Sequence, residues 1–303
     1  GICLAVSGMS VSLFIATIMT KVAMQWQSNM TNPYKLPKGN VLISLSGGRT
    51  SAYMLHQILV ANDGLRDDVV VAFANTGREM PETLDFVNEI SSRWNVAITW
   101  LEYTDQKPLF EVVNHNSASK FGEPFEKLIR KNKYIPNTLR RKCTQELKVL
   151  TIKRYLSSIG WKKWTNTIGI RSDEFRRVKE SKDNRWVNWF PLVDDNKTKF
   201  DVADFWLKQS QAFDLQLPII NGVTVYSNCD GCFLKSELKL AEMWRDHPEK
   251  MEWWSGLEQE FGHTFRYDGV SYQDIKNNLD KQGDFVFDIE GFFCQADDGE
   301  CTG

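Results

Sequence analysis

The segment 40–55, NVLISLSGGRTSAYML, places two glycines and three hydroxyl residues where an apolar run stops and a helical pattern begins. The junction consists of Ser46, Gly47, Gly48, Arg49, Thr50 and Ser51. A helix N-terminus presents unpaired backbone N–H groups, and glycines let an oxyanion approach them closely. The pattern Gly-x-x-x-x-Gly-Lys-Ser/Thr of a P-loop is absent. The junction therefore favours another kind of phosphate-binding loop, and the structural alternative is a tight turn with a serine cap.

Two further polar segments follow predicted strands. The first reads ANTGREMPET and the second GIRSDEFRR. Ligands of an open parallel sheet bind beyond the carboxyl ends of its strands. Arg171 directly follows Gly169 and Ile170, so we expect its guanidinium to point into that crevice, where arginine suits bidentate contacts with oxyanions. The alternative role of Arg171 is an ion pair with Asp173 or Glu174.

Four of the six cysteines form a second candidate site. Cys229 and Cys232 lie in the turn CDGC, whereas Cys143 and Cys294 are distant in the sequence. Four thiolates suit either a zinc ion or a [4Fe–4S] cluster, and a Cys-x-x-Cys turn by itself also suits a redox pair. Six cysteines are too few for a disulfide scaffold of this length. Their number predicts a reducing compartment, and we expect a cytoplasmic protein.

Charge is distributed unevenly along the chain. The formal net charge of −2 gives no global reason to expect nucleic acid as a partner. Residues 120–148, however, carry nine Lys or Arg against three acidic residues. This basic stretch predicts either a wall for phosphate, sulfate or a nucleic-acid strand, or a solvated helical face.

Alternating strand and helix patterns place these segments on an α/β fold. The expected strands cover residues 41–45, 69–74, 96–102, 164–170 and 186–193. The expected helices cover residues 51–60, 83–94, 144–156, 201–209, 236–261 and 272–279. We expect Asp201 to cap the fourth of these helices. Because strands and helices alternate, the sheet should be parallel, with right-handed crossovers and helices on both faces. The predicted fold is a three-layer α/β sandwich.

Four motifs together resemble a known family: SLSGGRTS, FANTGREMPETLDFV, GIRSDEFRR and NWFPLVDDNKTKFDVADFW. Their order and spacing are similar to those of the phosphoadenosine phosphosulfate (PAPS) reductase-like family. This family belongs to the adenine-nucleotide α-hydrolase superfamily, the PP-loop ATP pyrophosphatases. The resemblance covers about residues 40–232.

The resemblance implies a nucleotide site at the strand ends. Residues 46–51 would hold the phosphates of an adenine nucleotide, and Asn75, Thr76 and Gly77 would line its site. Arg171, with Gly169 and Ile170 before it, would meet the phosphate or sulfate end. The chain would then divide into three regions. These are an extension at 1–39 that is either non-native or a membrane anchor, a PP-loop nucleotide-binding domain at 40–217, and a helical region with a Cys-containing tail at 218–303.

The resemblance also implies two reactions. The first is the thiol-dependent reduction of PAPS or adenylyl sulfate to sulfite, with a thioredoxin-like reductant. The second is ATP-dependent, Mg²⁺-requiring adenylation for sulfur insertion into DNA or RNA. Thr50 stands where many ATP-cleaving members carry Asp, which favours the first reaction. The basic stretch 120–148 favours the second, and a nucleotide sensor without turnover is a third class. The sequence leaves the oligomeric state open.

Iron–sulfur clusters occur in relatives of this family, so the resemblance favours a [4Fe–4S] cluster on Cys143, Cys229, Cys232 and Cys294, with zinc as the alternative. The plant and bacterial reductases carry a Cys-Cys pair where only Cys143 stands. The segment GECTG resembles a Glu-Cys-Gly motif whose cysteine attacks the sulfate sulfur. By this resemblance Cys301 is the candidate nucleophile, although the Gly and His that follow in the motif are absent.

Overall fold

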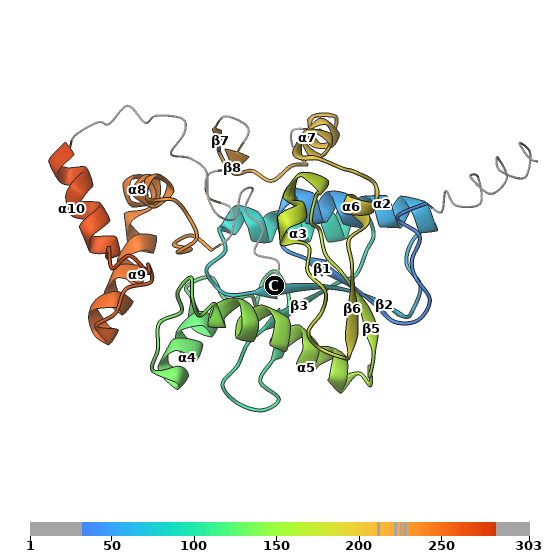
Figure 1. Cartoon of the computed structure of the whole chain (residues 1–303), viewed down its shortest axis with the longest axis horizontal. Coiled ribbons are helices and arrows are strands. Elements are labelled where there is room, and N and C mark those ends of the chain that lie inside the picture. Colours follow the sequence, from blue (N-terminus) through green and yellow to red (C-terminus); the bar gives the residue numbers. More distant parts are fainter. Residues whose placement is uncertain (1–31, 211–212, 221–222, 225, 227–228, 283–303) are drawn as a thin grey trace, which may run out of the picture.

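A six-stranded sheet forms the centre of the protein (Figure 1). The computed structural model describes residues 32–210, 213–220, 223–224, 226 and 229–282. The strands, in the spatial order β4-β3-β2-β1-β5-β6, are β1 (Val41–Leu45), β2 (Val69–Asn75), β3 (Ile98–Glu102), β4 (Glu111–Val113), β5 (Trp164–Thr167) and β6 (Trp186–Trp189). Every neighbouring pair is parallel except β3 and β4, which are antiparallel. The predicted parallel sheet is confirmed, and it carries one antiparallel edge strand.

Helices cover both faces of the sheet. One face carries α2 (Arg49–Asn62), α3 (Pro81–Arg93) and α7 (Lys199–Leu207). On the other face a π-helix, η1 (Thr144–Leu150), continues directly into α5 (Thr151–Ser158) (Figure 1). This arrangement confirms the expected three-layer α/β sandwich. None of the helices in the described ranges has the length and hydropathy of a membrane span.

The apolar sequence of β1 follows from its central position. Val41 and Ile43 belong to the core that includes α2, whereas Leu42 belongs to the core of α5 with Ile152 and Leu156. Successive side chains of a strand point to opposite faces, and both faces are covered here, so the strand needs a nearly continuous apolar run. Full burial of each such side chain stabilises the fold by about 1.5–3 kcal/mol. The strand is thereby fixed, and Ser46 becomes the first residue beyond its end.

The predicted strand 186–193 is too long. Strand β6 ends at Trp189, and Pro191 begins the short helix α6 (Pro191–Asp194). Proline lacks a backbone N–H for a sheet ladder, but its fixed φ suits the first turn of a helix. The strand must therefore end before Pro191.

The predicted cap of α7 is also wrong. The helix begins at Lys199, and its N-cap is Thr198 rather than Asp201. The carboxylate of Asp201 accepts hydrogen bonds from the backbone N–H and the hydroxyl of Thr198, both at 2.7 Å. These bonds lower the pKa of Asp201. Asp201 is thus the third-position partner of a capping box, whose reciprocal bonds stabilise the first helical turn.

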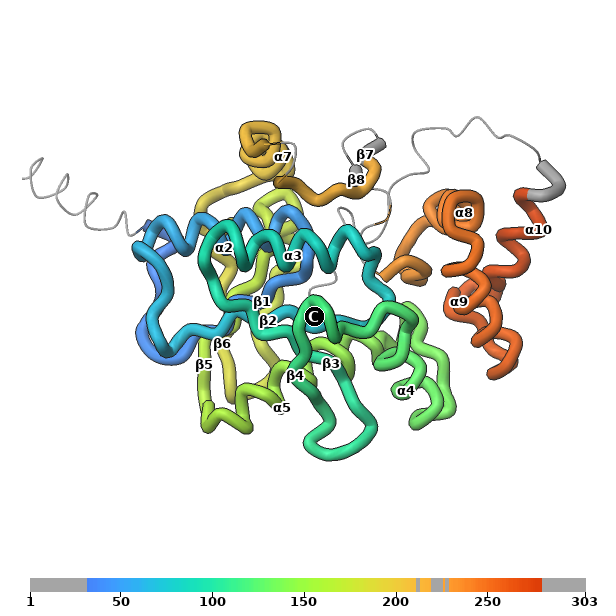
Figure 2. Tube along the Cα trace, turned by 180° about the vertical axis from the view of Figure 1, so that it is seen from behind, coloured from blue at the N-terminus to red at the C-terminus, as the bar shows by residue number. Residues whose placement is uncertain are grey.

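The C-terminal helices gather at one end of the molecule (Figure 2). They are α8 (Glu237–Asp246), α9 (Pro248–Phe261) and α10 (Tyr272–Gln282), preceded by the short hairpin β7 (Ile219–Ile220) and β8 (Val223–Thr224). The predicted helical region is confirmed, although it breaks at Pro248. Trp254 packs on Phe265, with ring centroids 4.8 Å apart, and Phe265 packs on Tyr272 at 5.7 Å. In the long segment 105–142, α4 (Glu123–Asn132) lies beside these helices, since Arg130 forms an ion pair with Glu260.

One carboxylate of α9 should make folding stability depend on pH. Glu258 is 5% exposed and accepts hydrogen bonds from the backbone N–H groups of Phe265 (2.9 Å) and Tyr272 (2.6 Å). Burial nevertheless raises its pKa to about 7. A carboxyl with a raised folded-state pKa stabilises the fold when protonated, and this contribution is lost as the pH rises through 7.

We therefore expect Glu258→Gln to remove a pH-dependent part of the stability. Relative to the variant, the wild-type free energy of unfolding should fall by about 3 kcal/mol between about pH 4.5 and about pH 8. Urea unfolding followed by tryptophan fluorescence at a series of pH values measures this difference. Glu252→Gln, on the exposed side of the same helix, is the matched control. A constant difference between wild type and Glu258→Gln over this range would contradict the assignment.

Candidate functional site

The junction between β1 and α2 forms a tight loop at the carboxyl edge of the sheet. The hydroxyl oxygens of Ser46 and Ser51 lie 2.9 Å apart, and the Ser46 N–H donates to Ser51 Oγ at 3.1 Å. Gly48 occupies the N-cap position of α2 in an extended conformation, and in the described chain no side chain caps the helix there. The alternative to phosphate binding was a tight turn with a serine as the helix N-cap, and this serine cap does not form. The N-terminal end of the helix dipole faces the loop, which favours an anion.

Two glycines allow this close packing. Gly47 has a φ of +87°, and a Cβ atom on it would lie 2.6 Å from Thr83 Cγ2. A Cβ atom on Gly169 would lie 3.1 Å from the Cα of Ser51. Larger residues at either position would displace the loop or the first turn of α2. Gly169, predicted from the end of β5, thus packs directly against the predicted phosphate loop.

The guanidinium of Arg171 lies between the two predicted segments. Arg171 is only 2% exposed, and its Nη1 donates to Thr50 Oγ1 at 3.1 Å. Its Nε donates to Asp173 Oδ1 at 3.0 Å, and Glu174 Oε2 lies 3.6 Å from Nη1. The contact to Thr50 brings the arginine to the loop, and the ion pairs of the alternative prediction also form. A role for Arg171 in binding an oxyanion stays a prediction.

The side chain of Arg49 points to a different partner. Its Nε and Nη2 form a bidentate pair with Asp214, at 2.6 and 2.7 Å, and Nη2 also donates to the carbonyl of Leu215 at 3.3 Å. These bonds attach the start of α2 to the segment after α7. The predicted contact of Arg49 with phosphate therefore depends on its backbone N–H group.

The segment after β2 is fixed by buried hydrogen bonds. Asn75 is fully buried, and its Nδ2 donates to Glu102 Oε1 (2.6 Å) and to the carbonyl of Ser119 (2.8 Å). Its Oδ1 accepts from the N–H of Gly77 at 3.0 Å. Gly77 has a φ of +79°, which a residue with a side chain rarely adopts. The side chain of Asn75 thus holds the turn in place, and direct contact of Asn75, Thr76 and Gly77 with a nucleotide stays a prediction.

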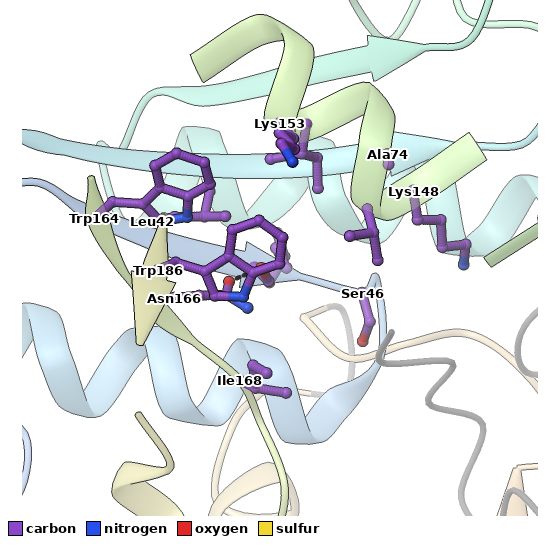
Figure 3. A pocket seen from close by; sticks show the side chains of 13 residues that line it. Leu42, Ser46, Ala74, Lys148, Lys153, Trp164, Asn166, Ile168 and Trp186 are labelled. Atoms are coloured by element: carbon purple, nitrogen blue, oxygen red, sulfur yellow. Dashed lines mark hydrogen bonds between the residues drawn. The ribbon is translucent and has the colours of Figure 1, made fainter. Parts of the chain in front are cut away.

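A cavity, here called the strand-end cavity, opens beside Ser46 on the α5 face of the sheet (Figure 3). Its lining residues are Leu42, Ser44, Leu45, Ser46, Ala74, Lys148, Val149, Ile152, Lys153, Trp164, Asn166, Ile168 and Trp186. Trp164 and Trp186 are stacked, with ring centroids 5.2 Å apart and an interplanar angle of 19°. Figure 3 shows the tryptophans toward one end, and Ser46 and Lys148 toward the other. The cavity thus joins an aromatic end to a polar, cationic end.

Three of the predicted metal ligands line a second cavity, here called the cysteine cavity. Its residues are Thr76, Phe125, Arg141, Cys143, Thr144, Lys148, Cys229, Cys232, Phe233, Leu234 and Trp254. Cys229 is buried, and burial raises the pKa of its thiol. Its Sγ lies 3.3 Å from Thr76 Oγ1. In the ranges that the structure describes, no three His, Cys, Asp or Glu side chains are placed to hold a metal ion. Cys294 and Cys301 lie outside those ranges.

The wall between the two cavities is the π-helix η1. Lys148 lines both cavities, and its Nζ lies 3.7 Å from Oε1 of Glu79, which is 3% exposed. The other carboxylate oxygen of Glu79 accepts from the N–H (2.9 Å) and the hydroxyl (2.8 Å) of Thr76. π-Helical turns are rare and frequently occur at functional sites. Lys148 is therefore a candidate site residue, and the sequence placed it only in a basic stretch.

A buried ion pair fixes the CDGC turn. Arg78 and Asp230 are 4% and 1% exposed, and their Nη2 and Oδ2 atoms lie 2.7 Å apart. The Trp254 indole N–H donates to Asp230 Oδ1 at 2.7 Å, and the Arg78 guanidinium lies 4.4 Å from the ring centroid of Trp253. Because Asp230 lies between Cys229 and Cys232, the pair attaches the cysteine turn to the segment after β2.

We expect Asp230→Ala to lower the free energy of unfolding by about 3–5 kcal/mol, because it leaves the Arg78 guanidinium buried without its carboxylate. Urea unfolding measures this loss. The matched control is Asp204→Ala, which removes an ion pair with Lys208 whose side chains are 62% and 70% exposed. The control should lose at most about 1 kcal/mol. Equal losses in both variants would show that the buried pair does not stabilise the turn.

The model of the phosphoadenosine phosphosulfate reductase domain family matches residues 40–211. The chain belongs to this family. It is 30% identical over 217 residues to the "Uncharacterized nin region protein ORF290" of Escherichia phage lambda, covering 68% of this chain and 69% of that protein. A crystal structure of PAPS reductase from Candida auris, in a phosphate complex, matches with a TM-score of 0.38 and 14% identity, over 72% of this chain and 97% of that one.

Membership of the PAPS reductase domain family confirms the resemblance drawn from the four motifs. It supports a nucleotide-binding enzyme family, and it leaves the reaction of this chain open. The matched range includes the predicted phosphate loop, the Asn75–Gly77 turn, Arg171 and Cys143, and it ends before the CDGC turn. Sequence patterns did not single out Trp164, Trp186 or Arg78. The order of strands and the packing of α5 and α9 bring these side chains to the site.

Proposed function

We propose that this protein binds an adenine nucleotide at the carboxyl edge of its sheet and acts on the phosphate or sulfate end. The base would occupy the strand-end cavity, where stacked Trp164 and Trp186 suit the flat apolar face of a purine. The phosphate end would lie at the loop formed by residues 46–51. The observation that carries this proposal is the continuity of the cavity with Ser46, which begins the loop.

The loop offers several groups to an anion. The hydroxyls of Ser46, Thr50 and Ser51 lie at or beside the N-terminus of α2, whose dipole favours negative charge. Arg171 is held against Thr50, and Lys148 lies at the polar end of the cavity. A buried guanidinium and a half-buried ammonium give strong, directional bonds to phosphate or sulfate oxygens. These groups would orient the anionic end toward the cysteine cavity, which shares Lys148.

For the reaction we favour the thiol-dependent reduction of PAPS or adenylyl sulfate. A thiolate, proposed to be Cys301, attacks the sulfate sulfur, and the S–O bond to the nucleotide phosphate breaks. The nucleotide leaves as a monophosphate or bisphosphate, and the cysteine becomes an S-sulfocysteine. A thiolate of a thioredoxin-like reductant then attacks Sγ of Cys301, which releases sulfite. Its second thiol resolves the mixed disulfide, so the dithiol supplies both electrons.

The cysteine cavity shares Lys148 with the strand-end cavity, so a nucleotide bound there would lie near its thiols. Cys143, Cys229 and Cys232 line it, and Cys294 is proposed as the fourth thiolate of a [4Fe–4S] cluster, with zinc as the alternative. The three described cysteines share this cavity, but as they stand in the described ranges they are not arranged to hold a metal ion. A bound cluster or ion would hold Cys143 against the CDGC turn.

The second candidate is Mg²⁺-dependent adenylation by ATP for sulfur insertion into DNA or RNA. A cationic cleft next to the strand-end cavity, with Arg176, Arg177, Lys179 and Lys182 in its lining, favours this candidate. Thr50 argues against it, because it stands where many ATP-cleaving members carry Asp, and a hydroxyl brings no negative charge to an Mg²⁺ ion.

One assay separates the two reactions. Protein purified without oxygen is incubated with a dithiol and PAPS or adenylyl sulfate, and in parallel with Mg²⁺ and ATP. We expect sulfite from a sulfonucleotide, and we expect Cys301→Ser to abolish sulfite while nucleotide binding is kept, because only the nucleophile is removed. Pyrophosphate from ATP would select the second candidate.

Three measurements serve as controls for this assay. Cys294→Ser should lower the iron and acid-labile sulfide content of the same preparation if it is a cluster ligand. Zinc without iron would select the alternative metal. If neither sulfite nor pyrophosphate forms while nucleotide binds tightly, the protein is a nucleotide sensor rather than an enzyme.

We expect Trp186→Leu to weaken adenine-nucleotide binding about tenfold, because stacking of a base on an aromatic ring contributes about 1–3 kcal/mol. Isothermal titration calorimetry with PAPS, adenylyl sulfate and ATP measures this change. Trp189→Leu is the matched control, since Trp189 lies on the same strand, packs against the other core and does not line the cavity. If the control weakens binding as much as Trp186→Leu does, the base does not occupy the strand-end cavity.

A further inference from the structure

A large cleft lined by cationic side chains opens next to the strand-end cavity. Its volume is about 610 Å³. Its lining residues are Thr138, Arg141, Val149, Asn166, Ile168, Ile170, Arg176, Arg177, Lys179, Glu180, Ser181, Lys182, Trp186, Asn188, Phe190 and Leu234. Five of these side chains are cationic, and Glu180 is the one carboxylate among them. In a chain whose formal net charge is −2, this cationic cleft is a local concentration of positive charge.

The cationic cleft and the strand-end cavity share part of their walls. Val149, Asn166, Ile168 and Trp186 line both. A molecule in the cleft would therefore lie beside a nucleotide in the cavity. The cations of the cleft are separate from the loop 46–51, which is proposed to bind the phosphates of that nucleotide. The cleft thus has the charge and the volume for a second anionic ligand.

Two contacts with the rest of the protein hold the loop that carries Lys179 and Lys182. The Asn188 side chain donates to the carbonyl of Lys179 at 2.9 Å, and Asp183 forms an ion pair with Lys153. Lys179 and Lys182 are exposed, and within the described ranges neither has an ion-pair partner. Their ammonium groups are therefore available to a ligand, while the chain that positions them is fixed.

The basic stretch 120–148 is not the source of this charge. Arg141 is the one cation of that stretch in the lining of the cationic cleft. Arg130, on α4, forms ion pairs with Glu126 and Glu260 instead. The basic stretch is thus a run of cations along the sequence, whereas most cations that line the cleft belong to residues 176–182.

We infer that the cationic cleft binds single-stranded nucleic acid. Its cations come from separate segments around residues 141 and 176–182, so they suit a ligand with several phosphates in a row rather than one phosphate group. Phe175, which is 65% exposed beside Arg176, offers a ring for base stacking. This inference rests on the proposed nucleotide site, because a strand in the cleft would lie beside the nucleotide bound there.

Fluorescence anisotropy tests the inference with single-stranded DNA and RNA of mixed sequence, about 20 nucleotides long and labelled with fluorescein, at about 50 mM and about 200 mM NaCl. We expect binding at the lower salt concentration that weakens at the higher one. The double variant Lys179→Glu/Lys182→Glu should bind at least about tenfold more weakly and show a smaller salt dependence. Calorimetry with an adenine nucleotide should be unchanged in this variant.

The matched control is Lys120→Glu/Lys127→Glu, which makes the same charge change at exposed positions of the basic stretch. It should keep wild-type affinity for the oligonucleotides. Three results would overturn the inference. They are no binding of the oligonucleotides by the wild type at the lower salt concentration, an equal loss of affinity in the control variant, or tighter binding of a double-stranded DNA of the same sequence. Each is distinguishable from a failure of the nucleotide site, because calorimetry reports that site separately.

Discussion

The guanidinium of Arg171, four residues after the end of β5, is buried, and a buried charge must find partners within the protein. It finds them on both sides, at Thr50 in the loop after β1 and at Asp173 in its own segment. Gly169 lets the two segments approach, since any larger residue would meet the backbone of Ser51. The loop and the arginine therefore form one rigid unit. A preorganised set of donors loses little entropy when it binds an anion.

A second buried charge pair has the same effect on the cysteines. Asp230 holds the CDGC turn against Arg78, which follows β2, and Trp254 of α9 completes the arrangement. The C-terminal helices are thus attached to the sheet at its carboxyl edge. Cys229 and Cys232 reach the cavity that Cys143 also lines, and η1 separates this cavity from the proposed base site. The proposed nucleotide site and the cysteine cavity are thus neighbours. The Arg171–Asp173 pair fixes the first, the Arg78–Asp230 pair fixes the second, and η1 lies between them.

The cationic cleft lies next to the proposed nucleotide site. Its walls continue those of the strand-end cavity, so a nucleotide, a polyanion and a set of thiols would meet around Val149, Trp186 and the adjoining Lys148. The relative from phage lambda is described only as uncharacterized, and family membership alone does not choose between reduction and adenylation. The cationic cleft supports adenylation for sulfur insertion into DNA or RNA, whereas Thr50 supports the reduction that we favour.

The sequence by itself determined the parallel strands of the sheet, most of the helices and a candidate anion-binding loop, because each has a local signal; the antiparallel edge strand β4 and helix α4 were not predicted. A continuous apolar run such as VLISL predicts a strand buried on both faces, and a Gly pair before a helical pattern predicts a turn that an anion can approach. Pro191 was a local signal as well, and with it the end of β6 could have been predicted. Only the tertiary structure decided that Arg49 pairs with Asp214, that Lys148 faces two cavities, and that the cations at 176–182 surround a cleft. These side chains meet partners far away in the sequence, and such contacts are fixed by strand order and helix packing rather than by spacing along the chain.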